Sequence, residues 1–206
     1  MCSESSKPAE PGTSSAGDPQ GLFERIENAR ETTRTKRAPI DSGHFDMRIT
    51  GDGTWHYRGS PIHRKPLVTL FSSVLKRDGD GQFWLETPVE RGRIDVDDAP
   101  FTAVDMNVEG EGPDQKLIFR TNLDETMTAG AAHPIRIAFD ESTGEPSPYI
   151  LVRDRLEALL TRAVYYALAE LVVTDSVSGN LGVWSDGIFF VLGPGDEITD
   201  MQGSSV

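Results

Sequence analysis

A stretch of the chain with many cations and no acid is the first candidate for binding chemistry. Residues 53–77 contain no Asp or Glu. Its cations are Arg58, Arg64, Lys65, Lys76 and Arg77. Arginine binds phosphate through a fork of N–H donors, and the backbone donors of a helix that starts near Pro66 would add to such a site. The sequence therefore predicts an anion site with Arg64 and Arg77 as phosphate ligands. The alternatives are that these cations are scattered over a solvated surface, or that they pair with acids of the second half across an interface.

Aromatic side chains supply the other part of a nucleotide site, because tryptophan and tyrosine stack on a base. The aromatic candidates are Trp55, Tyr57, Trp84, Tyr165 and Trp184. With the two arginines, the residues that we predict to contact a ligand are Trp84, Thr87, Arg153, Tyr165 and Trp184. In this hypothesis Trp84 or Trp184 stacks on the base and Thr87 donates a hydroxyl group. The alternative for each aromatic residue is packing in the core.

Several familiar motifs fail on spacing. The segment RDGDGQFWLETPVE resembles a calcium loop, but Phe83 stands where the loop needs Gly and Glu90 falls one residue late. The glycines around residue 53 lack the Lys-Ser or Lys-Thr pair of a phosphate loop. The four histidines are dispersed and form no HExxH pair. No GxSxG elbow is present, so a serine hydrolase has little support. We predict no metal and no cofactor.

Composition narrows the classes of protein further. The 206 residues carry a formal charge of −13, and residues 98–206 hold 6 basic against 18 acidic side chains. An acidic protein repels an extended nucleic acid, whereas the local cationic stretch suits a small anion. No run of about 18 apolar residues is present to span a membrane. The one cysteine, Cys2, excludes an internal disulfide, and no apolar leader begins the chain, so we expect a cytoplasmic location.

The elements that must position these residues follow from apolar spacing. Residues 1–20 and 196–206 are polar and predict disordered tails. A short amphipathic helix is expected around Phe23 and Ile26. Leu67, Leu70, Phe71, Val74 and Leu75 form one helical stripe, and a second stripe from Leu156 to Leu171 predicts a helix from about Asp154 to Val173. Strands are expected within residues 45–50, 54–59, 82–90, 92–98, 101–110, 115–122, 133–139, 148–153 and 181–193.

These elements predict an α+β fold of two tandem units, residues 21–97 and 98–195, each with a small antiparallel sheet and one amphipathic helix. Both units contain a hairpin with a Trp beside a Gly turn, GTWHYRG and GVWSDG. Internal duplication is one interpretation of this parallel, and independent units are the other.

The segment from Gly53 to Phe101, with LIFRTN, HPIR, PYILVRDRLEALLTRAVYYAL and GVWSDGIFFVLG, resembles the bacterial family called domain of unknown function 1285. The resemblance covers roughly Phe23 to Gly193. It implies two related α+β units, the second loosely similar to a pleckstrin-homology barrel, with a cleft between the units for a nucleotide-like molecule in signalling. The family name implies no activity, so the resemblance predicts the fold better than the function.

We therefore expect a ligand-binding module, more so than an enzyme, that holds a nucleotide-like anion between its units in signal transduction. One alternative is an enzyme acting on a phosphorylated small molecule, with Asp78 and Glu90 as candidate acids. The other is a protein-interaction scaffold that binds its partner through the acidic second half and exposed sheet edges.

Overall fold

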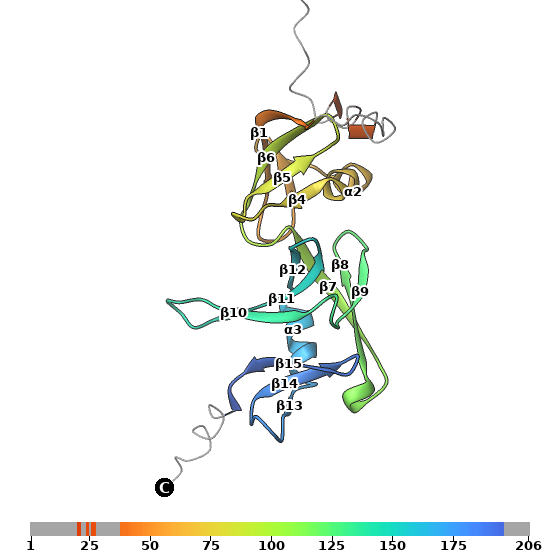
Figure 1. The fold of residues 1–206 in the computed structure, drawn as a ribbon, viewed down its shortest axis with the longest axis vertical. Coiled ribbons are helices and arrows are strands. Elements are labelled where there is room, and N and C mark those ends of the chain that lie inside the picture. Colours follow the sequence, from red (N-terminus) through yellow and green to blue (C-terminus); the bar gives the residue numbers. More distant parts are fainter. Residues whose placement is uncertain (1–19, 22–23, 25, 28–37, 196–206) are drawn as a thin grey trace, which may run out of the picture.

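The computed structural model describes residues 20–21, 24, 26–27 and 38–195, so the two predicted tails and most of the expected N-terminal helix lie outside the described residues. Within that part the chain is a mixed helix-and-strand protein built mostly of strands, which confirms the predicted class. Its two helices with defined bounds are α2 (Lys65–Ser73) and α3 (Arg162–Ala169). Three sheets follow one another along the long axis of the molecule (Figure 1).

The first sheet contains six strands in the order β3-β2-β1-β6-β5-β4. They are β1 (Ile40–Ile49), β2 (Trp55–Tyr57), β3 (Ser60–Pro61), β4 (Leu75–Arg77), β5 (Phe83–Glu86) and β6 (Glu90–Val96). The predicted hairpin around Gly51 is confirmed, because Ile49 pairs with Trp55 in antiparallel register. The prediction of a purely antiparallel sheet is wrong, since the central strands β1 and β6 are parallel.

The second sheet repeats this connectivity, with the order β10-β11-β12-β7-β8-β9. Its strands are β7 (Phe101–Glu109), β8 (Lys116–Thr121), β9 (Thr126–Thr128), β10 (Ile135–Phe139), β11 (Pro146–Arg153) and β12 (Leu156–Leu160). Again the first and last strands are central neighbours and run parallel. The two edge strands β9 and β10 are joined by residues 129–134 alone, which reach about 20 Å when extended. The edges must therefore approach each other, so the sheet curls.

Helix α2 links the two edge strands of the first sheet and forms where the sequence predicts it. Pro66 lies in its first turn, where the missing N–H costs nothing. The stripe Leu67, Leu70 and Phe71 is buried, and Phe71 stacks on the fully buried Trp55 with ring centroids 6.2 Å apart. Trp55 therefore packs in the core, which is the alternative to ligand binding that we gave for each aromatic residue.

The predicted helix from Asp154 to Val173 is wrong over its first third, because residues 156–160 form strand β12 and α3 spans only Arg162–Ala169. In LEALL the alternating Leu156, Ala158 and Leu160 are buried, which is the period of a strand. A five-residue segment with four apolar residues fits both periods, and pairing with β11 and β7 decides between them. Asp154 is therefore a residue of the β11–β12 turn and no helix cap, with a positive φ of 42°.

The third sheet is small and is anchored to the second by a buried serine. It comprises β13 (Val173–Thr174), β14 (Leu181–Ser185) and β15 (Ile188–Gly193), and the predicted hairpin turns at Asp186 and Gly187. The Ser185 hydroxyl donates to the Ala129 carbonyl at 2.7 Å and accepts the Leu117 N–H at 3.0 Å. The short 3-10 helix η1 (Gly112–Asp114) packs beside β14. None of the described helices is long and apolar enough to cross a lipid bilayer.

Candidate functional site

The junction between the first two sheets, here called the seam, is crossed by ion pairs. Arg153, at the end of β11, pairs with Glu125 and donates to the Ser72 carbonyl of α2 at 2.8 Å. Its guanidinium also lies over the Phe101 ring, 5.1 Å from the centroid. Arg153 thus ties the second sheet to the helix of the first.

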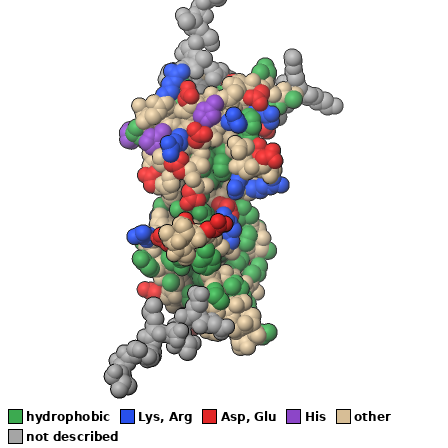
Figure 2. Space-filling model, turned by 90° about the vertical axis from the view of Figure 1, so that its left-hand side faces the viewer, with side chains coloured by type: hydrophobic (Ala, Val, Ile, Leu, Met, Phe, Trp, Pro, Cys, Tyr) green, Lys and Arg blue, Asp and Glu red, His purple; other side chains and the backbone are tan. Residues whose placement is uncertain are grey.

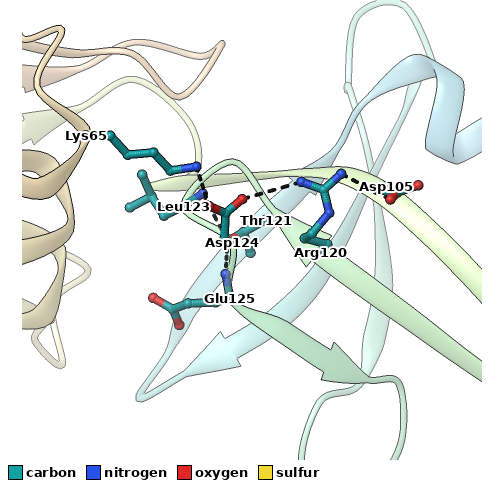
Figure 3. A network of polar contacts seen from close by, with 7 residues as sticks. All are labelled: Lys65, Asp105, Arg120, Thr121, Leu123, Asp124 and Glu125. Carbon is teal, nitrogen blue, oxygen red and sulfur yellow. Dashed lines mark hydrogen bonds and ion pairs between the residues drawn. The ribbon is translucent and has the colours of Figure 1, made fainter.

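Cations of the acid-free stretch also face acids of the second unit. Lys65 Nζ lies 2.5 Å from Asp124, Lys76 lies 3.9 Å from Asp154, and Arg77 lies 3.7 Å from Glu157. Figure 3 shows Lys65 reaching from α2 to Asp124, whose other carboxylate oxygen is contacted by Arg120. For these three cations, the alternative of pairing with the acidic half is confirmed.

A denser polar cluster surrounds Glu157 at the same seam. Arg136 donates two hydrogen bonds to Glu157, at 2.5 and 2.7 Å, and lies over the Tyr149 ring. The Tyr149 hydroxyl donates to Asp98 at 2.7 Å. Burial, followed by this bond to Asp98, raises the pKa of Tyr149 to about 12. The sequence does not reveal this cluster, because no local pattern shows that β4, β10, β11 and β12 meet there.

The raised pKa of Tyr149 predicts a loss of stability at high pH. An unfolded tyrosine titrates near pH 10, so the folded state holds the proton more tightly than the unfolded state. The contribution of Tyr149 is complete below about pH 10 and is lost as the pH rises towards 12. In urea unfolding at pH 9 to 11.5, the stability of the wild type should fall more steeply than that of Tyr149→Phe. Equal slopes would contradict this assignment.

Besides Arg77, three of the predicted ligand contacts lie on the first unit, each with an intramolecular partner. Arg64 precedes α2 and donates to Gln20 at 2.8 Å. Trp84 donates its indole N–H to Asp78 at 2.8 Å. The buried Thr87 hydroxyl donates to the Glu90 carbonyl and accepts the Glu90 N–H, which closes the turn between β5 and β6.

The other predicted contacts are distributed over the second half. Tyr165 lies on α3, and Trp184 lies on β14 with its ring against Phe189 at a centroid distance of 5.2 Å. Arg153 lies at the end of β11, and the nearest residue of β11 in the α3 pocket, Pro148, is about 17 Å away by the rise of a strand. The structure therefore brings Arg77 and Arg153 to the seam and places Tyr165 and Trp184 elsewhere. The binding role of each residue stays a prediction.

Tyr165 lines a pocket of about 370 Å³, here called the α3 pocket. The pocket lies between the starts of β11 and α3 and the end of β12. Its lining residues are Glu145, Pro146, Ser147, Pro148, Leu159, Leu160, Arg162, Tyr165 and Tyr166. Tyr165 is half-buried, whereas Tyr166 is 64% exposed, so neither ring takes the deep core position that helical spacing offers.

The electrostatics at the start of α3 favour an anion. Thr161 precedes the helix without a side-chain capping bond, and no acid lies in the first turn. The first backbone bond of the helix is donated by Tyr165 to Thr161, which leaves the N–H groups of residues 162–164 outside the helical ladder. Arg162 adds a full charge and is opposed by Glu145 at 3.7 Å. A small anionic molecule with a flat ring suits this combination of donors, cation and tyrosines.

A second and wider hollow lies on the exposed face of the first sheet, with a volume of about 700 Å³. Its charged or titratable lining residues are His44, Asp46, Arg48, His56, Arg58 and Asp95. Figure 2 shows histidines gathered among acidic and basic side chains on the upper part of the molecule. Within the described residues, no three His, Cys, Asp or Glu side chains are grouped to hold a metal ion.

The protein is a small chain of curled, mixed sheets with open pockets. Among its described residues, no recognised set of catalytic side chains is assembled. Two family models match the chain: the "Domain of unknown function (DUF1285), N-terminal domain" over residues 35–99, and the "Protein of unknown function (DUF1285), C-terminal domain" over residues 100–192. The chain belongs to the DUF1285 family, which confirms the resemblance.

A solved structure agrees with this assignment, and a second one is also similar in sequence. A DUF1285 family protein from Silicibacter pomeroyi DSS-3 is 44% identical with a TM-score of 0.72, over 82% of this chain and 94% of the other. One from Shewanella baltica OS155 is 28% identical with a TM-score of 0.48, over 60% of this chain and 90% of the other. No curated protein matches the chain. The family models meet between residues 99 and 100, and the predicted division after residue 97 stays a prediction.

Proposed function

We propose that this protein is a ligand-binding module that holds a small anionic molecule with an aromatic ring, such as a nucleotide, in the α3 pocket. The observation that carries the proposal is a pocket of about 370 Å³ that combines two tyrosines with Arg162 at an uncapped helix start. Small-molecule sites are concave, mostly apolar and furnished with a few polar groups, and this volume lies in their usual range. The α3 pocket replaces the seam as the proposed site, because it offers the N–H donors of residues 162–164 and two tyrosine rings beside its cation, whereas the seam cations are paired with carboxylates.

The parts of the pocket suggest a division of roles. The anionic group binds the N–H donors of residues 162–164 and the guanidinium of Arg162. The ring packs against Tyr165 and Tyr166, with Pro146 and Pro148 on the opposite wall. A role in signalling and a cytoplasmic location accompany this proposal as expectations.

The enzyme alternative depends on Asp78, whose surroundings favour a structural role. Its carboxylate accepts N–H groups from Trp84, Asp80 and Gln82 at 2.8 to 3.0 Å. These bonds, chiefly the one from Trp84, lower the pKa of Asp78, which makes it a poor general acid. Asp78 therefore supports the turn between β4 and β5.

We further propose that the first two sheets arose by duplication of one six-strand unit. The support is their shared connectivity. In each sheet the first three strands run from the centre to one edge, and the last three run from the other edge back to the centre. The helices do not repeat, since α2 joins β3 to β4 whereas α3 follows β12. The likeness of the second unit to a pleckstrin-homology barrel stays a prediction.

A thermal-shift panel tests the binding proposal on the full chain. The ligands are AMP, GMP, CMP, UMP and inorganic phosphate at moderate salt. A ligand at 100 times its Kd stabilises the folded state by about 2.7 kcal/mol, or about 5 to 10 °C for a chain of this size. We expect at least one nucleotide to exceed phosphate, because only the nucleotide also contacts the tyrosines. No shift with any nucleotide would refute the proposal.

Glu145 competes with an anionic ligand for Arg162 in the α3 pocket, so replacing it with a neutral residue should tighten nucleotide binding. Its carboxylate lies 3.7 Å from the guanidinium of Arg162 and would compete with an incoming anion. We expect Glu145→Gln to lower the Kd of the nucleotide about two- to fivefold, the range of an exposed ion pair. Isothermal titration measures this change, with Glu141→Gln in the same loop as control because Glu141 does not line the pocket. Equal affinities of the two variants would contradict the role of Glu145.

A further inference from the structure

The hollow on the first sheet is built from three neighbouring strands. His44, Asp46 and Arg48 come from β1, His56 from β2 and Asp95 from β6. Arg58 and Gly59 close one side from the turn between β2 and β3. Arg93 of β6 is the register partner of His44. The groups that face the two histidines are therefore of both charges.

Arg58 occupies a turn position that does not suit its residue type. Tyr57 pairs with Ser60, so Arg58 and Gly59 form a two-residue hairpin turn with φ values of 48° and 79°. Such a turn prefers Asn, Asp or Gly at its first position, because the side chain of any larger residue crowds the backbone at positive φ. Backbone conformations that the local sequence disfavours concentrate at functional sites. In this turn, the unfavourable residue is the one that places a guanidinium at the hollow.

Hydrogen bonds hold the other charged groups in place. Arg48 donates to both oxygens of Asp97, at 2.7 and 3.0 Å. His44 accepts the Asp46 N–H at its Nδ1 atom, so its proton lies on Nε2, which is 3.3 Å from Asp95. Arg58 Nε lies 3.9 Å from Asp46, and the guanidinium lies over the Tyr57 ring, 5.4 Å from its centroid.

The charge of this lining changes with pH. While the histidines are neutral, Arg48 is paired with Asp97, Arg58 lies beside Asp46, and Asp95 faces the Nε2 atom of His44. Histidine is the side chain that gains charge between about pH 8 and pH 5. Protonation of His56 gives the hollow an additional positive charge, whereas a second proton on His44 would have to displace the Asp46 N–H from Nδ1. An anion that enters then meets Arg58 and His56.

We propose that this hollow is a second binding site, separate from the α3 pocket, which takes a tetrahedral dianion of the phosphate or sulfate type and strengthens as the pH falls. Binding next to protonated His56 draws a proton onto the protein, so affinity and proton uptake increase together. Arg58 is the main fixed contact of the anion, and His56 supplies the pH dependence.

Sulfate is the probe for this site, because it stays a dianion across the pH range and leaves the protein as the only titrating component. Titration of the full chain at pH 5.5 and 7.5 should give at least tenfold tighter binding at pH 5.5. His56→Gln should reduce this ratio, whereas His63→Gln, outside the hollow, should preserve it. Sulfate bound in the α3 pocket meets no histidine, so its affinity should not vary in this way.

Arg58→Asn distinguishes a binding role from a structural one. This change suits the turn, so the unfolding midpoint should stay the same or rise, while sulfate affinity at pH 5.5 falls at least tenfold. Arg155→Asn is the matched control, because Arg155 also has a positive φ, 68°, and carries the same charge in another two-residue turn. It should relieve the same strain without changing sulfate affinity. Absence of sulfate binding at pH 5.5, equal affinity at both pH values, or full binding by Arg58→Asn would each overturn the proposal.

Discussion

Arg153→Ala should lower the free energy of unfolding by about 3 kcal/mol, the largest effect that we expect from a single charged residue. The guanidinium spans the seam, bonded to Glu125 of the second sheet and to the Ser72 carbonyl of α2. Its removal leaves the carboxylate without this partner and exposes the face of Phe101. Arg153→Lys should recover little, because one ammonium group cannot reproduce the forked contact. Chemical denaturation in urea measures the change.

Arg120→Ala is the control for this measurement. Arg120 contacts Asp105 at 3.1 Å and Asp124 at 3.5 Å, but all three side chains are about half exposed and lie within the second unit. Exposed ion pairs of this kind contribute less than about 1 kcal/mol. If Arg120→Ala lowers the free energy of unfolding as much as Arg153→Ala does, the contacts of Arg153 across the seam contribute no more to stability than an exposed ion pair.

Tyr165→Ala should weaken nucleotide binding about 10- to 100-fold, since stacking of one base on an aromatic side chain is worth about 1 to 3 kcal/mol. The ring is half-buried at the wall of the α3 pocket. Its side chain accounts for little of the core, because the fully buried residues of α3 are Val164 and Leu168. Stability should therefore change much less than affinity. Isothermal titration with AMP gives the affinity, and thermal unfolding gives the stability.

Tyr165→Phe separates stacking from the hydroxyl group. This variant keeps the ring, so its affinity should lie within about twofold of the wild type. A loss as large as that of Tyr165→Ala would assign the effect to the hydroxyl and contradict the stacking arrangement.

Local pattern predicts most elements of the fold. The stripe from Leu67 to Phe71 and the hairpins at Gly51 and Gly187 appear as expected, because neighbours in the sequence decide them. The segment Leu156–Leu160 shows where local pattern fails. Its four apolar residues suit the period of a helix and that of a strand, and only pairing with β7 and β11 makes it a strand. The parallel pairing of β1 with β6 has no local signal either, because it joins residues about 50 positions apart.

The candidate site was harder to predict than the fold. Residue types suggest that Arg77 and Arg153 bind an anion, but acids from distant strands occupy them, and no spacing rule reveals Glu157 or Glu125 as partners. Tyr165 was predicted from its residue type, and the structure places it at the α3 pocket, where its binding role stays a prediction. Pro146 and Pro148 were not predicted to line the pocket, because the segment before α3 was expected to be helical and its pairing as strand β12 with β11 was not foreseen.

The central claim is that the α3 pocket, rather than the seam, binds the ligand. A two-dimensional amide NMR titration of the full chain with AMP tests it most directly. We predict the largest saturable shifts at the amides of residues 162–165. Shifts confined to Ser72, Glu125 and Arg153, with the amides of α3 unmoved, would contradict the claim and return the ligand to the seam.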